Sequence, residues 1–230
     1  MRRRCPSPVP RTHDVARTRA IDAMAEDLPE LPPGAFGKAD QTSDLLFYAQ
    51  ERLVTHIDAG AIGAVTELYR RTLPAGGAIL DLMSSWVSHL PPEMAYAGVT
   101  GHGMNAGELA ANPRLASWFV QDLNADPRLP LEDGSFDAAT LCVSVQYLQR
   151  PVAVFREVRR VLHTGAPFVV TFSDRCFPTK AVAIWQALDG PSQQELVSLY
   201  LRRAGFERLE RQASVPRRGD PLWAAIGHAL

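Results

Sequence analysis

Residues 78–83 read AILDLM, an apolar run that directly follows Gly76 and Gly77. A short apolar run after turn-forming residues predicts a buried strand. Further runs of this kind follow at residues 95–100, 118–121, 136–145 and 167–172. Because helix-like segments separate them, the pattern predicts a mainly parallel sheet covered on both faces. With an antiparallel pair expected at residues 205–209 and 222–226, the fold class is a doubly wound, Rossmann-like α/β sheet of seven strands.

Helices are expected between the strands, at residues 84–90, 105–112, 151–162, 182–188 and 194–204. Ahead of the sheet, apolar residues recur every three or four positions from Leu46 to Tyr69. This spacing predicts an amphipathic helix, or two helices broken near Gly60 and Gly63. We therefore expect a poorly ordered, basic and Pro-rich segment (1–40), a helical cap (41–74) and a domain that holds the sheet (75–230).

Composition excludes several classes of protein. Lys and Arg total 24 against 25 Asp and Glu, a net charge of −1, so no global field attracts nucleic acid or an anionic membrane. No apolar run approaches the ~20 residues that span a bilayer, and no secretory signal is apparent. The 3 cysteines are widely spaced and indicate neither a disulfide framework nor a metal site. We expect a cytoplasmic protein whose partner is a small molecule; its oligomeric state stays open.

Short polar stretches follow four of the expected strands, at residues 81–86, 101–105, 122–124 and 144–147. In open parallel sheets, ligands bind beyond the carboxyl ends of the strands, where the strand order reverses. Four polar strand ends that converge there predict a ligand site.

One interpretation of this site is a dinucleotide-binding unit. Gly101 and Gly103 precede a helix, and Asp122 follows at roughly the 20-residue spacing of a ribose-binding acid. However, Ala106 stands where the third glycine of that motif belongs. The unit also begins one strand late, because the strand expected at residues 78–83 precedes it. An NAD(P)-dependent oxidoreductase is therefore kept as an alternative.

The other interpretation rests on four stretches in order: ILDL at residues 79–82, QDL at 121–123, LPLEDGSFDA at 129–138 and VFREVRRVL at 154–162. In this order and spacing the chain resembles the class I S-adenosylmethionine-dependent methyltransferases of the broad type 11 kind. Two features depart from that family. Residues 83–89, MSSWVSH, replace its glycine-rich loop, and Gly103 stands where it usually has an acid after the second strand.

The resemblance implies a cofactor site for S-adenosylmethionine. Asp81 would lie near the methionine ammonium, and Ser84 and Ser85 would begin a helix whose N-terminus binds the carboxylate. Asn105 would offer its amide to the ribose in place of the missing acid. Asp122 and Leu123 would contact the adenine. The remaining cofactor-binding candidates are Gly103, Met104 and Ser144.

The sequence defines the residues that would bind the methyl acceptor less closely than those that would bind the cofactor. A proton-bearing acceptor needs a base, and the catalytic candidates are His56, His89 and Tyr147, with His102 as a further histidine. The substrate-contact candidates are Tyr48, Gln146 and Tyr147, whereas Cys142 is expected in the core. The predicted reaction is methyl transfer to a small, possibly natural-product acceptor; a non-catalytic protein of the same fold is a second alternative.

Overall fold

A computed structural model describes residues 28–230, which divide between two units at the junction of Ala35 and Phe36. The described part of the first unit, residues 28–35, consists of turns closed by backbone hydrogen bonds from Leu31 to Leu28 and from Ala35 to Pro32. Most of the expected basic segment, residues 1–27, lies outside the described residues. The second unit holds the sheet and the site.

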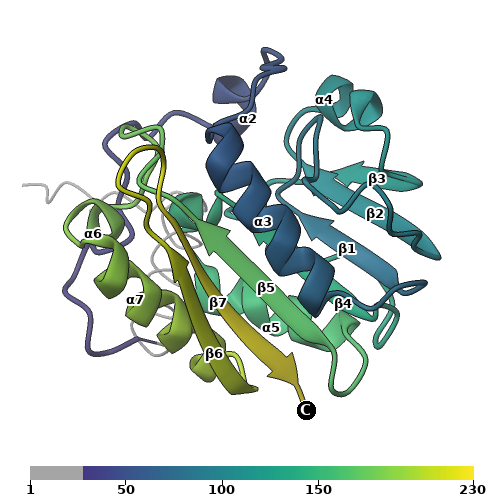
Figure 1. Cartoon of the computed structure of the whole chain (residues 1–230). Coiled ribbons are helices and arrows are strands. Elements are labelled where there is room, and N and C mark those ends of the chain that lie inside the picture. The colour runs from purple at the N-terminus through teal and green to yellow at the C-terminus, as the bar shows by residue number, and fades with distance from the viewer. Residues whose placement is uncertain (1–27) are drawn as a thin grey trace, which may run out of the picture. The chain divides into compact units, whose positions relative to one another are not determined.

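The sheet has the predicted seven strands, and their order is β3-β2-β1-β4-β5-β7-β6 (Figure 1). All neighbours are parallel except β7, which is antiparallel to both β5 and β6. The strands are β1 (Ala78–Leu82), β2 (Gly98–Gly103), β3 (Ser117–Val120), β4 (Ala138–Cys142), β5 (Pro167–Phe172), β6 (Phe206–Ser214) and β7 (Leu222–Ala229). Ile79 of β1 is level with Val99 on one side and with Ala138 on the other. The strand order reverses between β1 and β4, so the carboxyl ends of these strands form the expected ligand-binding edge.

Helix α3 (Ala59–Thr72) covers one face of the sheet (Figure 1). Asp58 caps it by accepting a hydrogen bond from the amide of Ala61 at 2.9 Å. The buried residues Val65, Leu68 and Tyr69 pack against Ile79 and its neighbours in β4, β5 and β7. Because this packing stabilises the whole helix, Gly60 and Gly63 lie inside it, and the predicted helical region is interrupted at residues 48–58 instead.

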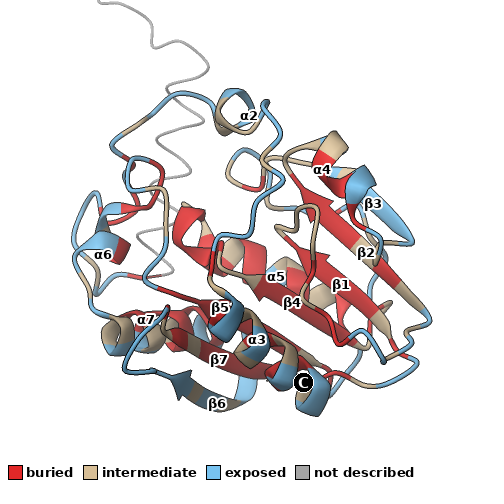
Figure 2. Cartoon of the chain, turned by 45° about the horizontal axis from the view of Figure 1, so that its top comes forward, coloured by how far each residue is buried: buried red, intermediate tan, exposed pale blue. Residues whose placement is uncertain are grey.

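Helices α5 (Pro151–Val161) and α7 (Gly190–Arg203) pack together and supply the aromatic core of the other face. The Phe155 ring lies 4.9 Å from the Phe168 ring of β5 and 6.1 Å from the Tyr200 ring of α7. Alternation along β5 sends Phe168 to this face and Val169 to the α3 face. Figure 2 shows that the central strands are buried on both faces, whereas β6 and β3 are largely exposed. The shorter helices are α2 (Asp44–Phe47), α4 (Ala106–Ala111), the 3₁₀ turn η1 (Val145–Tyr147) and α6 (Ala183–Gln186).

The segment between β1 and β2 contains no helix, so the predicted helix at residues 84–90 is wrong. Its backbone is bonded to neighbouring elements instead. The amide of Ser84 donates to the carbonyl of His102, and the Asn112 amide group donates to the carbonyl of Ser85 at 2.9 Å. These partners satisfy backbone groups that would be hydrogen-bonded within a helix. Pro91 and Pro92 also disfavour a helix here, because proline has no N–H donor.

The helical cap is also shorter than predicted. After the single turn of α2, residues 48–58 form an irregular loop; we call α2 and this loop, residues 44–58, the lid. Close to the expected boundary at residue 40, Lys38 forms a bridge with Val182, and the amide of Asp40 donates to the carbonyl of Thr179 at 2.8 Å. Among the residues placed by the structure, no helix has the length and apolar character needed to cross a membrane.

Candidate active site

A cavity of about 300 Å³ lies at the carboxyl ends of β1, β2 and β4 and beneath the lid. This volume lies within the range of small-molecule sites, roughly 300–1,000 Å³. Asp81 and Asp122 both line it, as do His56 and His89. The strand ends and the lid therefore bring the predicted cofactor and acceptor residues, with the exception of Gln146, to one cavity.

Asp81 forms part of the cavity floor. Its carboxylate accepts hydrogen bonds from Thr140 Oγ1 at 2.8 Å and from Ser84 Oγ at 2.6 Å. Burial raises the pKa of Asp81, and these hydroxyl donors oppose the rise. The two bonds fix the carboxylate in one orientation below any ligand.

Ser84 and Ser85 line the cavity but do not begin a helix. The predicted carboxylate site at a helix N-terminus is therefore wrong. Ser84 bonds to Asp81, and Ser85 Oγ donates to Glu108 Oε2 at 2.6 Å.

The end of β2 explains why no acid stands at Gly103. A Cβ atom there would lie 2.5 Å from the carbonyl oxygen of Ser84, too close for any side chain. Gly101 and Gly103 both lie inside β2, so they do not form the loop that the dinucleotide interpretation requires. Met104 also lines the cavity.

Asn105 caps helix α4, and its amide holds the lid. Asn105 Oδ1 accepts from the amides of Gly107 and Glu108 at 2.9 and 3.1 Å, and Nδ2 donates to the carbonyl of Tyr48 at 2.9 Å. A contact between this amide and a ribose would require the bond to the lid to open.

Glu108 is a cavity residue that the sequence interpretation missed. The side chain is buried; Oε1 accepts from the amide of Arg52 at 2.8 Å and Oε2 accepts from Ser85. Asn105 followed three residues later by Glu108 is a capping-box spacing, which could have placed this carboxylate in the first turn of α4. The capping box does not say that the carboxylate turns toward a cavity.

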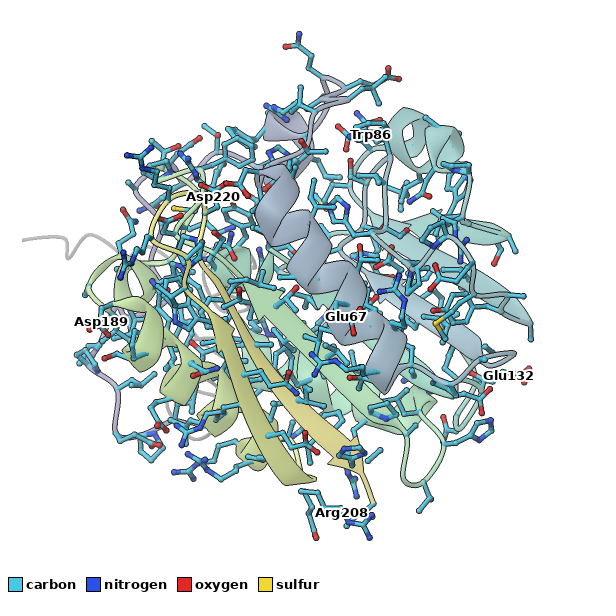
Figure 3. All side chains as sticks on the ribbon, viewed as in Figure 1. Glu67, Trp86, Glu132, Asp189, Arg208 and Asp220 are labelled. Atoms are coloured by element: carbon cyan, nitrogen blue, oxygen red, sulfur yellow. The ribbon has the colours of Figure 1, made fainter. Side chains whose placement is uncertain are left out.

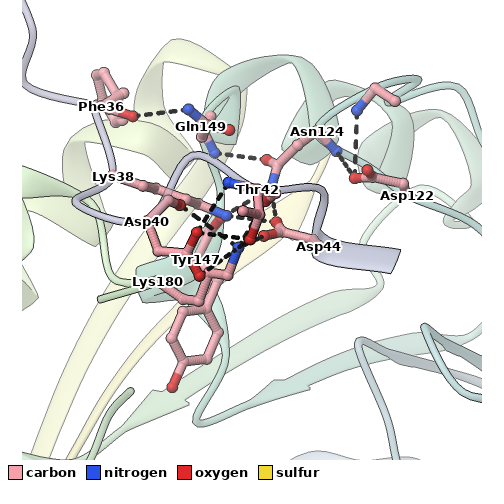
Figure 4. Close-up of polar contacts among 11 residues, drawn as sticks. Phe36, Lys38, Asp40, Thr42, Asp44, Asp122, Asn124, Tyr147, Gln149 and Lys180 are labelled. Carbon is pink, nitrogen blue, oxygen red and sulfur yellow. Dashed lines mark hydrogen bonds and ion pairs between the residues drawn. The ribbon is translucent and has the colours of Figure 1, made fainter. Parts of the chain in front are cut away.

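The β3 end contributes Asp122 and the buried Leu123. Asp122 Oδ1 accepts from the amide of Asn124 at 2.9 Å, whereas Oδ2 has no partner among the described residues (Figure 4). Asn124 Nδ2 donates to Asp44 Oδ2 at 3.1 Å and to the carbonyl of Tyr147 at 3.0 Å. Asp122 therefore presents one free carboxylate oxygen at this end of the cavity.

The β4 end is strained and polar. Val143 has a φ of 48°, a left-handed conformation that β-branched residues rarely adopt. Ser144 is buried and lines the cavity, and its Oγ atom has no hydrogen-bond partner among the described residues. Met83 and His89 also have positive φ and line the cavity, with φ of 54° and 52°. Such conformations cluster at functional sites, which supports the assignment of this cavity.

The end of β4 and the turn η1 hold one residue that was predicted correctly and one that was not. Cys142 packs against the core as predicted, and it also lines the cavity, because β4 ends at this residue. Burial raises the pKa of its thiol to about 11, so it remains protonated at neutral pH. Gln146 does not line the cavity, because η1 turns it into the interior, where its Nε2 donates to the carbonyl of Val143 at 3.0 Å.

Aromatic side chains line the lid side of the cavity. The Phe177 ring lies 5.4 Å from the His56 ring, 6.0 Å from the Tyr147 ring and 6.5 Å from the Tyr48 ring. The Tyr147 hydroxyl accepts from the amide of Phe177 at 2.9 Å, and burial raises its pKa to about 12. Tyr147 therefore positions Phe177 and stays protonated near neutral pH. Trp86 lies beside α4 (Figure 3), and its Nε1 donates to the carbonyl of Val54 in the lid at 3.0 Å.

The three histidines differ in their availability. Burial lowers the pKa values of His56 and His89 below 6.5, so both are neutral near pH 7, and no hydrogen bond within the described chain engages their rings. His102 is fully engaged: Nδ1 accepts from the amide of Met83 at 3.1 Å, and Nε2 bonds to the carbonyl of Gln121 at 2.9 Å. His56 and His89 are thus the available bases, and His102 joins strand ends.

Comparison with known proteins decides between the two interpretations. Residues 92–170 match the protein family described as "Methyltransferase domain". This match, which runs from the segment before β2 into β5, identifies a methyltransferase domain in the chain. No functionally curated protein has a matching sequence.

Solved structures share the fold of this methyltransferase. The (4+2)-cyclase SpnF is 18% identical with a TM-score of 0.58, over 96% of this chain and 97% of that chain. A possible histamine N-methyltransferase from Thermotoga maritima is 17% identical with a TM-score of 0.53, over 74% and 90%. An S-adenosylmethionine-dependent methyltransferase from Aquifex aeolicus is 13% identical with a TM-score of 0.54, over 81% and 97%. These similarities show the fold.

The residues around the cavity fit S-adenosylmethionine, the cofactor of this class. The unpartnered Ser144 Oγ and the free Asp122 oxygen offer polar partners, and Glu108 supplies a carboxylate on the side where Gly103 has none. The fit therefore does not depend on the glycine-rich loop that this methyltransferase lacks.

Proposed function

We propose that this methyltransferase moves the methyl group of S-adenosylmethionine to a proton-bearing atom of a small molecule bound beneath the lid. The observation that carries the proposal is a single cavity that joins Asp81 and Asp122 to two neutral histidines, His56 and His89. Its modest volume and the net charge of −1 favour a small metabolite over nucleic acid or protein as the acceptor.

In this proposal the cofactor residues lie along the strand ends. Asp81 faces the methionine ammonium, and Asp122 and Leu123 hold the adenine. Glu108 accepts from the ribose hydroxyls with the lone pairs that Arg52 and Ser85 leave free, since each carboxylate oxygen can accept more than one hydrogen bond. Ser144, Gly103 and Met104 complete the wall.

When bound, S-adenosylmethionine supplies an activated methyl group on a sulfonium. The chain's residues then align the acceptor and take up its proton. His56 or His89 accepts this proton on a neutral imidazole nitrogen. Phe177, held by the Tyr147 hydroxyl, closes the acceptor side together with Tyr48 and excludes water.

Calorimetric titration with S-adenosylhomocysteine and with NAD+ tests the cofactor assignment. We expect S-adenosylhomocysteine to bind and NAD+ to give no signal. Asp122→Ala should weaken the binding by about 1–3 kcal/mol, the cost of losing a buried polar partner. Tight NAD+ binding without a response to S-adenosylhomocysteine would reverse the assignment.

Transfer of a labelled methyl group to a panel of small acceptors tests turnover. His56→Ala and His89→Ala are compared with His163→Ala, since His163 is exposed and does not line the cavity. Cofactor binding without labelled product from any acceptor would instead favour a non-catalytic protein of this fold.

A further inference from the structure

Arg52 is a charged residue of the cavity wall that the proposed function does not use. Two arginines line the cavity, Arg52 and Arg175. Arg175 is neutralised by Asp220, whose Oδ1 lies 2.8 Å from Nε and 2.7 Å from Nη2. Arg52, in contrast, has no carboxylate partner among the described residues, since its guanidinium donates only to the carbonyls of Phe47 and Gln50.

The position of Arg52 is fixed from two sides. Its backbone amide donates to Glu108 Oε1 at 2.8 Å, and its Nη2 donates to the carbonyl of Phe47 at 2.8 Å. The guanidinium carbon lies 4.6 Å from the Phe47 ring centre and 5.7 Å from the Tyr48 ring centre. Such cation–π contacts hold the cation in place without neutralising its charge.

Phe177 connects this cation to a candidate base. Its ring centre lies 5.5 Å from the Arg52 guanidinium carbon and 5.4 Å from the His56 ring centre. The guanidinium and the imidazole therefore border the same aromatic ring. A flat acceptor that stacks on this wall can present an anionic group to one and a proton-bearing atom to the other.

We propose that Arg52 binds the carboxylate of an aromatic acceptor and so determines substrate specificity. A guanidinium without an acidic partner, half-buried beside aromatic rings, binds a planar carboxylate through charge-assisted hydrogen bonds. The rings of Tyr48, Tyr147 and Phe177 then hold the flat body of the acceptor. This inference rests on the proposed function, because it assigns the acceptor of that same site.

The test compares three probes that share one aromatic ring: 4-hydroxybenzoate, its methyl ester and 4-hydroxybenzamide. Each is titrated calorimetrically into the protein after saturation with S-adenosylhomocysteine. For the wild-type chain we expect the carboxylate to bind at least about tenfold more tightly than either neutral probe. Equal binding of the three probes, or no binding of the carboxylate, would overturn the inference.

Matched variants locate the effect. Arg52→Gln should bring the affinities of the three probes within about twofold of one another, while Arg52→Lys, which keeps the charge but loses the planar guanidinium, should retain only part of the preference. Arg175→Gln should leave the preference unchanged, because Asp220 already neutralises that cation. An equal loss in Arg175→Gln would show a general positive field and contradict the specific role of Arg52.

A further variant keeps the inference testable if Arg52→Gln disturbs the lid. Phe177→Leu should weaken all three probes to a similar extent, because it removes the ring surface and leaves the charge. Unchanged affinities in Phe177→Leu would contradict the aromatic wall. Failure of S-adenosylhomocysteine to bind would count against the proposed function; the probe comparison, repeated on the unloaded protein, would still decide the role of Arg52.

Discussion

The imidazole of His102 accepts a hydrogen bond from the backbone amide of Met83 at 3.1 Å, across the ends of β2 and β1. The other ring nitrogen bonds to the carbonyl of Gln121, just after β3, at 2.9 Å. One buried side chain thus joins the ends of three strands that border the cavity. The arrangement requires a neutral ring, because a protonated Nδ1 cannot accept from an amide.

Acidification should therefore destabilise the fold through His102. Burial lowers its pKa from 6.5 to about 4, so between these values the unfolded chain binds more protons than the folded chain. The contribution of neutral His102 to the free energy of unfolding is fully present above pH 6.5. It is lost as the pH falls toward 4, and the loss amounts to at most about 3 kcal/mol. Urea unfolding at a series of pH values measures this loss. His102→Gln, which does not titrate, should show a smaller loss than the wild-type chain over the same range; an identical pH dependence would contradict the assignment.

Glu108→Gln should weaken binding of ligands that carry a ribose diol. The expected loss is about 1–3 kcal/mol, because the carboxylate is replaced by an amide with fewer acceptor sites. Adenosine and 2′-deoxyadenosine titrations measure it: the wild-type chain should prefer adenosine, and the variant should lose that preference. Glu51→Gln is the control, since Glu51 is an exposed lid residue that does not line the cavity. A preference that survives in Glu108→Gln would remove this residue from the ribose site.

His56→Ala should lower turnover and leave cofactor affinity nearly unchanged. Removal of a general base typically costs about 10²–10⁴-fold in rate. Because burial lowers the pKa of His56, the acidic limb of the wild-type rate profile should lie below pH 6.5. The measurement is kcat against pH for any acceptor found in the methyl-transfer screen. If His56→Ala turns over normally and His89→Ala does not, His89 is the base.

Lys180→Met should destabilise the protein through the base of the lid. Lys180 is fully buried, and its Nζ lies 3.2 Å from both Asp40 Oδ2 and Asp44 Oδ1 (Figure 4). Removal of one partner of a buried ion pair typically costs about 3–5 kcal/mol, and the loss here should lie below that range, because the Asp40 and Asp44 side chains are 29% and 12% exposed. Chemical denaturation measures the change. In Lys180→Met, Asp44 still has an ion pair with Lys38, whose Nζ lies 2.5 Å from Asp44 Oδ2. The double variant Lys38→Met, Lys180→Met should therefore lower the free energy of unfolding more than either single variant.

The sequence by itself determined the central architecture. Apolar runs such as residues 167–172 correspond to β5 residue for residue, and Pro151 marks the start of α5, because buried strands and helix starts depend on local composition. It also determined that Asp81 lies near the end of one strand and that Asp122 lies just after another, and parallel pairing then brings such strand ends to one edge of the sheet.

Only the tertiary structure decided the details of the site. The sequence of residues 84–90 predicts a helix, yet they form an irregular segment that bonds to His102 and Asn112. Glu108 and Arg52 are far apart in sequence, and they meet at the cavity because the lid folds over α4. The local pattern of a chain records which residues prefer a strand or a helix. It does not record which distant groups satisfy a buried amide or leave a cation unpaired, because those partners come together only when the chain has folded.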